Sequence, residues 1–278
     1  MRAWISIVVS TVVALVLAPA AAADTAASSN WAGYAVHRSG VSFKKVSASW
    51  RQPTVSCERG SQTYSAYWVG IGGFNPNSAA LEQIGTEADC DAYGRPVLSA
   101  WYELVPAPST PITFTLTPGD LITATVVVNG HTVTMSLYDA TRHRGVTKTL
   151  KARVVDTSSA EWIVEAPSDC NGTYSCQTLP LANFGTASFS AATAQSTSGR
   201  HGSIASSNWS FTKINLLPGG DRFTAFPGRA VGTATVSSLK AGGSAFNVGY
   251  STGTGASTYM SVRSAAARAS GQLVHPAR

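Results

Sequence analysis

The sequence predicts an all-β fold, a sandwich or jelly roll of many short antiparallel strands in a single domain. From residue 30 to about residue 253, alternating or β-rich segments follow one another and are separated by turn residues. No stretch shows a 3.6-residue apolar period with helix caps. Charged residues make up only 12% of the chain. Together these features indicate an extracellular β-sandwich.

The strands follow from the pattern of β-rich runs and breakers. We expect strands at 46–51, 63–71, 79–85, 97–105, 111–117, 120–128, 131–138, 146–155, 160–165, 182–190, 203–212, 229–237, 244–251 and 257–263. The clearest turn is Asn129-Gly130, which lies between two β-rich runs and predicts a two-residue hairpin loop.

The two ends of the chain differ from the region between them. Residues 1–23 have a positive start at Arg2, an apolar stretch over 5–17 and small residues before Asp24, as in a signal peptide. The apolar stretch is too short for a stable membrane span, so we expect a secreted protein with no membrane partner after cleavage. The domain then covers 24–253, beginning with a short polar lead-in, and 254–278 holds a last strand and a loosely ordered tail.

The chain has four cysteines, and an even number in an exported protein favours disulfides. Cys170 and Cys176 are near neighbours and would close a local loop, which leaves Cys57 to pair with Cys90. Zinc binding is the competing interpretation. The cysteine spacings match no usual zinc pattern and no histidine lies nearby, so we expect no metal.

The net charge is +6, but the basic residues are scattered over turns and strand edges. No aromatic–basic run or recognition helix accompanies them, so we expect no nucleic-acid partner. The charge is then a matter of solubility and adhesion to cell surfaces. We expect a monomer.

Two segments place glutamates inside otherwise half-buried strands. In 99–105, Trp101 and Glu103 share one face while Tyr102 lies on the other, and in 160–166, Glu161 and Glu165 share a face. Only 14 of 278 residues are acidic. A carboxylate among aromatic side chains on a sheet face is desolvated, which favours a chemical role over a merely solvated one.

Two further strands add an amide and another indole. The run 67–73 contains Trp68, and the run 81–85 contains Gln83. If all four faces line one concave sheet, the site holds carboxylates, a neutral amide and tryptophan walls. This set suits activation of water by a carboxylate acting as general base, with an amide N–H group stabilising the oxyanion.

These motifs resemble the glutamic peptidases, the eqolisin family. The matching segments occur in order at 29–31, 67–73, 81–85, 100–103 and 160–165, followed by Cys170 and Cys176. The resemblance implies a bent antiparallel β-sandwich of concanavalin-like shape. It also implies an acid-stable, pepstatin-insensitive endopeptidase that acts on polypeptides without a cofactor.

By this resemblance, Gln83 and Glu165 would form the catalytic dyad. The side chains that would line or support the site are Trp68, Trp101, Tyr102 and Glu103. The sequence departs from the family pattern at three positions, with Gly72 and Glu87 where the family usually has Asp, and Ile84 where it usually has Thr. We expect an acidic pH optimum.

Two other hypotheses fit the same residues. A jelly-roll glycosidase would use Glu103 and Glu165 as acid and nucleophile, flanked by tryptophans. A lectin-like module would stack sugars on the tryptophans and bind without turnover. The first predicts release of reducing sugar that does not depend on Gln83.

Overall fold

The computed structural model describes residues 24–75, 77–170, 176–217 and 232–252, with the side chains of 170 and 176–177 left out. The predicted signal peptide, 1–23, and the predicted tail, 254–278, lie outside the described residues. Within them the only helix is a single 3-10 turn, η1 (Ala241–Gly243), and everything else regular is β-structure. The prediction of an all-β fold is confirmed.

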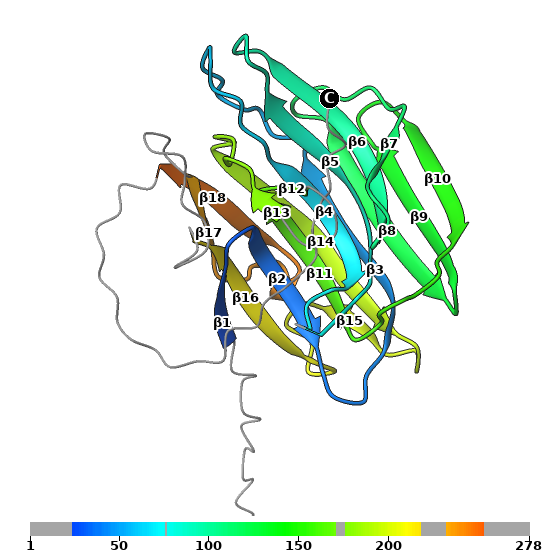
Figure 1. Cartoon of the computed structure of the whole chain (residues 1–278). Coiled ribbons are helices and arrows are strands. Elements are labelled where there is room, and N and C mark those ends of the chain that lie inside the picture. Colours follow the sequence, from blue (N-terminus) through cyan, green and yellow to red (C-terminus); the bar gives the residue numbers. More distant parts are fainter. Residues whose placement is uncertain (1–23, 76, 171–175, 218–231, 253–278) are drawn as a thin grey trace, which may run out of the picture.

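The described residues form eighteen strands, numbered in the order of the chain (Figure 1). The first nine are β1 (Asp24–Ser28), β2 (Trp31–His37), β3 (Phe43–Arg51), β4 (Ala66–Gly72), β5 (Leu81–Cys90), β6 (Pro96–Val105), β7 (Thr110–Ile112), β8 (Leu121–Asn129) and β9 (Thr132–Asp139). The others are β10 (Arg144–Lys151), β11 (Ser159–Glu165), β12 (Ser168–Cys170), β13 (Cys176–Thr178), β14 (Thr186–Ser196), β15 (His201–Ser203), β16 (Ser210–Leu216), β17 (Gly232–Val236) and β18 (Phe246–Thr252).

Sixteen of these strands form one continuous sheet. Its order is β10-β9-β8-β3-β14-β18-β17-β16-β2-β11-β4-β5-β6-β7, with β15 beside β14, and β12 and β13 form a separate pair. All pairings are antiparallel except that of β1, which lies parallel to β16. Strand β11 inserts between β2 and β4, so segments more than 80 residues apart become neighbours.

The sheet bends back on itself and encloses the main core. One large apolar cluster contains residues from β2, β4, β5 and β11 together with residues from β3, β8, β9, β14 and β18. Two indoles bridge the layers: Trp162 Nε1 donates to the carbonyl oxygen of Ser47 at 2.9 Å, and Trp50 Nε1 donates to Thr86 Oγ1 at 3.0 Å. We call the side of the sheet that points into this cluster the core face.

The opposite side of β2, β11, β4, β5 and β6 carries a smaller cluster built around Trp31, Trp68 and Trp101. We call it the tryptophan face. Strand β4 shows how the chain serves both faces: Tyr67 and Val69 belong to the core face, and Trp68 between them belongs to the tryptophan face. This alternation is the two-residue period of a strand. All seven residues of β4 are buried.

Three details of the predicted strands are corrected. The expected polar lead-in is strand β1, because its backbone pairs with β16. The expected strand over 111–117 ends at Ile112, because Asp120 accepts a hydrogen bond from the Thr117 backbone N–H and closes a turn. The expected strand over 203–212 is broken by turns between Ser203 and Ser210.

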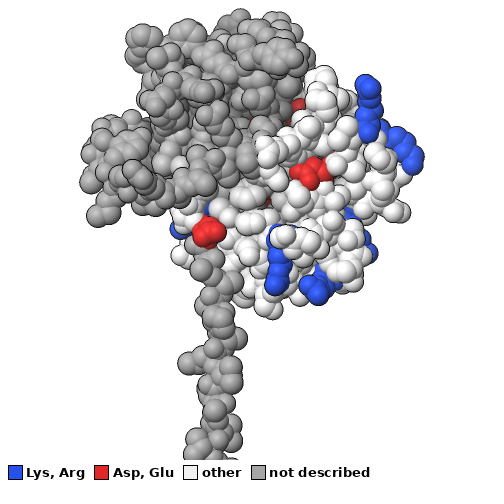
Figure 2. All heavy atoms as spheres, turned by 60° about the horizontal axis from the view of Figure 1, so that its bottom comes forward, with Lys and Arg blue, Asp and Glu red and all other residues white. Residues whose placement is uncertain are grey.

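The disulfide between Cys57 and Cys90 is present, as predicted, with its Cα atoms 5.3 Å apart. Cys170 and Cys176 lie opposite each other in the β12–β13 pair, but their side chains are outside the described set, so their bond stays a prediction. No helix in the described part of the chain is long and apolar enough to cross a membrane. On the face shown in Figure 2, Lys and Arg side chains lie in separate small groups among mostly uncharged residues.

Candidate active site

Three rows of residues cross the tryptophan face, each made of residues that sit opposite one another on β6, β5, β4, β11 and β2. The Gly70 row is Glu103, Gln83, Gly70, Glu161 and Ala35. The Trp68 row is Trp101, Gly85, Trp68, Ile163 and Gly33. The Ala66 row is Ser99, Glu87, Ala66, Glu165 and Trp31. Carboxyl groups therefore occupy the two outer rows, and indoles with glycines occupy the row between them.

Gln83 is fully buried, and its amide nitrogen has a defined partner. Its Nε2 atom donates to Glu103 Oε2 at 2.5 Å, between residues directly opposite on β5 and β6. Glu103 is also buried, with 1% of its surface exposed. The amide oxygen, Gln83 Oε1, is buried and has no hydrogen-bond partner in the described part of the structure. The nitrogen end of the amide is fixed, and its oxygen is available to accept a hydrogen bond.

Glu165 is fully buried and held by two N–H donors. Asn30 Nδ2 donates to Glu165 Oε1 at 3.0 Å, and Trp68 Nε1 donates to Glu165 Oε2 at 2.8 Å. Asn30 is itself oriented by Ser28, whose hydroxyl donates to Asn30 Oδ1 at 3.0 Å. Two N–H donors match a carboxylate, which is an acceptor only when ionised.

Asn30 and Trp31 were not among the predicted site residues. Trp31 packs edge-on against Trp68 with ring centroids 5.0 Å apart, which fixes the indole that donates to Glu165. The signal for both was in the sequence, because they belong to the Ser-Asn-Trp segment at 29–31, the first of the matching motifs.

Gln83 and Glu165 lie on the same face of the sheet, on the two strands that flank β4. They are not in the same row: Gln83 is opposite Gly70 and Glu165 is opposite Ala66, four residues along β4. At roughly 3.3 Å per residue, this offset is about 13 Å along the strand. Trp68 occupies the interval. The backbones of Gln83 and Glu165 are therefore separated by this offset and by two strand spacings, with the Trp68 row between them.

Glu161 lies in the same row as Gln83, and its electrostatic environment differs from that of Glu165. Complete burial raises the pKa of Glu161 well above its usual range, and the negative charges of Asp156 and Glu82 raise it further. The Ser159 hydroxyl is close enough to oppose this rise in pKa. Glu161 is therefore a neutral carboxylic acid at acidic pH, unlike a carboxylate held by N–H donors.

The structure separates the other predicted residues. Trp68 and Trp101 belong to the tryptophan face, and both are buried. Tyr102 is only partly buried and packs against the large cluster on the core face, so it lies on the opposite side of the sheet from Gln83. Ile84 is a core-face residue as well, and it fills the main core.

At Glu87 and Gly72, the other two positions where the sequence departs from the family pattern, the structure places a carboxyl group nearby. Glu87 lies in the Ala66 row and accepts a hydrogen bond from Ser99 Oγ at 2.5 Å. At Gly72, a Cβ atom would lie 2.5 Å from the carbonyl oxygen of Asp156 and 2.7 Å from its Cβ. Asp156, from the loop before β11, therefore occupies the space that a side chain at position 72 would need.

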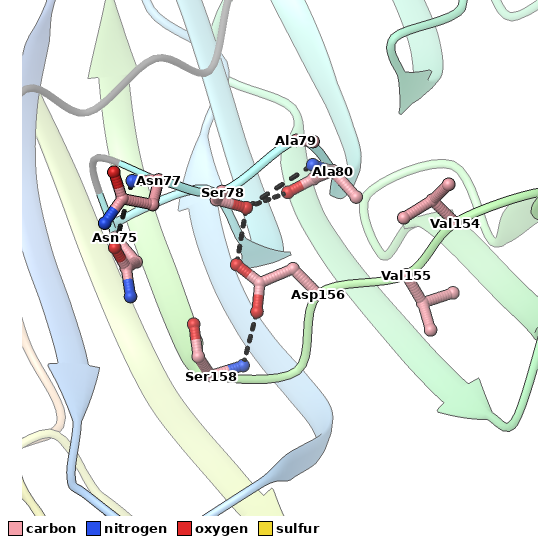
Figure 3. A pocket seen from close by; sticks show the side chains of 9 residues that line it. All are labelled: Asn75, Asn77, Ser78, Ala79, Ala80, Val154, Val155, Asp156 and Ser158. Atoms are coloured by element: carbon pink, nitrogen blue, oxygen red, sulfur yellow. Dashed lines mark hydrogen bonds between the residues drawn. The ribbon is translucent and has the colours of Figure 1, made fainter.

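Asp156 also forms one wall of a cavity of about 260 Å³ at the end of β4 (Figure 3). Its Oδ2 atom accepts hydrogen bonds from Ser78 Oγ at 2.5 Å and from the Gly73 N–H at 3.2 Å. Its Oδ1 atom accepts from the Ser158 N–H at 2.8 Å. Burial alone would raise the pKa of Asp156, but these donors outweigh it and hold the pKa below its usual value. In the described residues no group of three or more His, Cys, Asp or Glu could hold a metal ion.

Comparison with known proteins gives a family match over most of the chain. Residues 29–221 match the model of the peptidase A4 family. No curated protein sequence matches this chain. The fold resembles a crystal structure of scytalido-glutamic peptidase with a transition-state analogue inhibitor, with 24% identity and a TM-score of 0.62 over 80% of this chain and 98% of that one. It also resembles SCP-B, an eqolisin family member in complex with the tripeptide Ala-Ile-His, with 23% identity and a TM-score of 0.55 over the same shares.

Proposed function

Because this chain belongs to the peptidase A4 family, we propose that it is a secreted, acid-acting glutamic endopeptidase with Glu165 and Gln83 as its catalytic pair. Peptide-bond hydrolysis comes with the family. Our proposal adds the catalytic pair of Glu165 and Gln83, activity at acidic pH and secretion of the protein. The observation that carries it is the position of the two side chains, buried on one face of the sheet on either side of β4.

In this mechanism the Glu165 carboxylate takes a proton from a water molecule, which attacks the scissile carbonyl carbon. One N–H of the Gln83 amide is used by Glu103, and the second is available to the oxyanion that forms. Glu165 then returns the proton to the leaving amine as the carbon–nitrogen bond breaks. Glutamine suits the second role because its amide stays neutral and keeps its donors at low pH.

The surroundings of the two glutamates on β11 support Glu165, rather than Glu161, as the base. Glu165 accepts two N–H hydrogen bonds, which favour its ionised form. The raised pKa of Glu161 keeps that group protonated, and a neutral carboxylic acid cannot accept the proton of water. Two carboxyl groups on one strand thus have different chemical roles because their environments differ.

The expected substrates are polypeptides, with Trp68 and Trp101 lining the site and Tyr102 supporting it from the core face. The family assignment favours this function over the glycosidase and lectin hypotheses. The monomeric state and the lack of a nucleic-acid or membrane partner stay predictions.

The test is cleavage of denatured casein at pH 3 to 5 by the secreted protein, with and without pepstatin. Glu165→Ala and Gln83→Ala should each reduce kcat, the latter by about 10²–10³. Glu82→Gln is the matched control, because Glu82 is a buried carboxyl on the core face of β5. A folded Glu165→Ala protein that still cleaves casein at the wild-type rate would exclude Glu165 as the base.

A further inference from the structure

Gln83 and Glu161 lie in the same row of the tryptophan face, with only Gly70 between them. Two strand spacings of about 4.8 Å separate their backbones by roughly 10 Å, which two long side chains can span. Gly70 itself contributes no side chain to this interval. Trp68 and Leu81 reach into the space above it, because a Cβ atom there would lie 2.9 Å from both Trp68 Cζ3 and Leu81 Cδ1, so a contact between Gln83 and Glu161 passes beside apolar groups.

The two side chains have complementary needs. Gln83 Oε1 is a buried acceptor with no hydrogen-bond partner in the described residues. Within the same residues, neither carboxyl oxygen of Glu161 makes a hydrogen bond of ordinary length and angle, although the Ser159 hydroxyl is near. A protonated carboxyl group has one O–H donor, and an unmatched buried acceptor is costly. Each group therefore offers what the other lacks.

We propose that Glu161 is a positioning residue for Gln83, donating its carboxylic acid proton to Gln83 Oε1 directly or through one water molecule. Glu103 holds the nitrogen end of the same amide. With Nε2 held by Glu103 and Oε1 held by Glu161, the Gln83 amide has one orientation. In that orientation the second N–H of Nε2 points towards the oxyanion. This inference rests on the proposed role of Gln83.

The arrangement has a consequence for pH dependence. Once Glu161 ionises, it presents an acceptor to an acceptor, and the amide loses its fixed orientation. Asp156 of the preceding loop and Glu82 of β5 raise the pKa of Glu161. Other titratable groups on the same face of the neighbouring strands include Glu103 of β6, Glu165 of β11 itself and His37 of β2. We therefore expect kcat to decline as pH rises, and we expect the ionisation of Glu161 to contribute to that decline.

Two substitutions separate this role from a purely structural one. Glu161→Gln keeps an N–H donor of similar length, so kcat should stay within about threefold of wild type while the decline at higher pH weakens. Glu161→Leu removes the donor, so kcat should fall about 10- to 100-fold with KM unchanged. Glu58→Gln, which changes an exposed carboxyl group, should leave both kcat and the pH profile unchanged.

A spectroscopic measurement tests the same contact without relying on activity. The side-chain amide resonances of Gln83, assigned by their loss in Gln83→Ala, should shift with the ionisation of Glu161 in the wild type and not in Glu161→Gln. This readout is available even if Glu161→Leu does not fold or if the protein fails to cleave casein.

Two results would overturn the proposal. The first is wild-type kcat and an unchanged pH profile in Glu161→Leu. The second is a Glu161→Gln protein as inactive as Glu161→Leu, because the carboxyl group itself would then take part in the reaction. Gln83 resonances that do not respond to Glu161 would exclude the contact independently of either result.

Discussion

Gln83 and Glu103 sit directly opposite each other on β5 and β6 and are joined by a hydrogen bond of 2.5 Å from Nε2 to Oε2. Both residues are buried. The amide that would stabilise an oxyanion therefore has one of its two donors committed to a neighbouring strand. Rigid placement of this kind matters because a preorganised donor needs no rearrangement during the reaction.

Removing the partner of that amide should impair catalysis. Glu103→Ala leaves Gln83 Nε2 without its acceptor, so we expect kcat to fall about 10-fold, in line with roughly 1–3 kcal/mol for an unsatisfied buried group. Glu103→Gln retains an acceptor oxygen and should lose less. Steady-state kinetics on casein or a quenched peptide measures both, and equal activity of Glu103→Ala and wild type would contradict the predicted role.

The hydrogen bond from the indole nitrogen of Trp68 should contribute to both catalysis and stability. Trp68→Phe keeps most of the ring but removes the N–H that Glu165 Oε2 accepts. A hydrogen bond to a charged group is worth about 1.5–3 kcal/mol, so both the free energy of unfolding and kcat should fall.

Trp162→Phe is the matched control for that substitution. It removes an indole hydrogen bond to the Ser47 carbonyl oxygen on the core face of β11. Urea unfolding should show a loss of stability in both variants, whereas kcat should drop only in Trp68→Phe. A similar loss of kcat in the two proteins would mean that general packing, not the bond to Glu165, is responsible.

The protein should be more stable in acid than at neutral pH. Burial, followed by the charge of Asp156, raises the pKa of Glu82 from 4.5 to about 8. A carboxyl with a raised pKa in the folded state contributes stability that is complete below the unfolded pKa and is lost as pH rises through the folded pKa. At about 1.4 kcal/mol per pKa unit, the loss between pH 4.5 and 8 is on the order of a few kcal/mol.

Glu161 acts in the same direction, because its pKa is also raised. Asp156 acts in the opposite direction, since its lowered pKa gives stability that is lost as pH falls below its usual 3.8. Denaturant unfolding at pH 4, 6 and 8 measures the balance. Glu82→Gln should flatten the decline, whereas the exposed Glu58→Gln should not. A stability that rises from pH 5 to pH 8 in the wild type would contradict this account.

The disulfide should contribute strongly to stability. It joins residues 33 apart in the sequence and ties the end of β5 to the loop before β4. Closing a loop of that length is worth roughly 3–4 kcal/mol in the chain-entropy model. The Cys57→Ser, Cys90→Ser double variant should lose about this amount in urea unfolding. Reduction of the wild type should have the same effect, and an unchanged midpoint in both experiments would exclude the contribution.

The sequence was sufficient to predict the faces of the strands. The two-residue period assigned Glu103, Glu161 and Glu165 to sheet positions among aromatic residues, and all three are buried. It also separated Tyr102 from Trp101. These predictions succeeded because the direction of a side chain in a strand depends only on local geometry.

The register between strands could not be predicted in the same way. That Glu161 sits opposite the same glycine as Gln83 depends on β11 entering between β2 and β4, a pairing set by the packing of distant segments. The place of Asp156 beside Gly72 is also a matter of tertiary structure, because a loop supplies the group that fills that space. No local pattern marks either relationship.

The parallel pairing of β1 with β16 would link removal of the predicted signal peptide to the proposed catalytic site. If the export machinery cuts before Asp24, the new amino terminus is the first residue of a strand whose last residue, Ser28, orients Asn30. A cut only five residues later would discard the whole strand and with it the hydroxyl that aligns a donor to Glu165. The exact position of signal-peptide cleavage would then affect the hydrogen bonding of Glu165, although the cleaved bond is not part of the site.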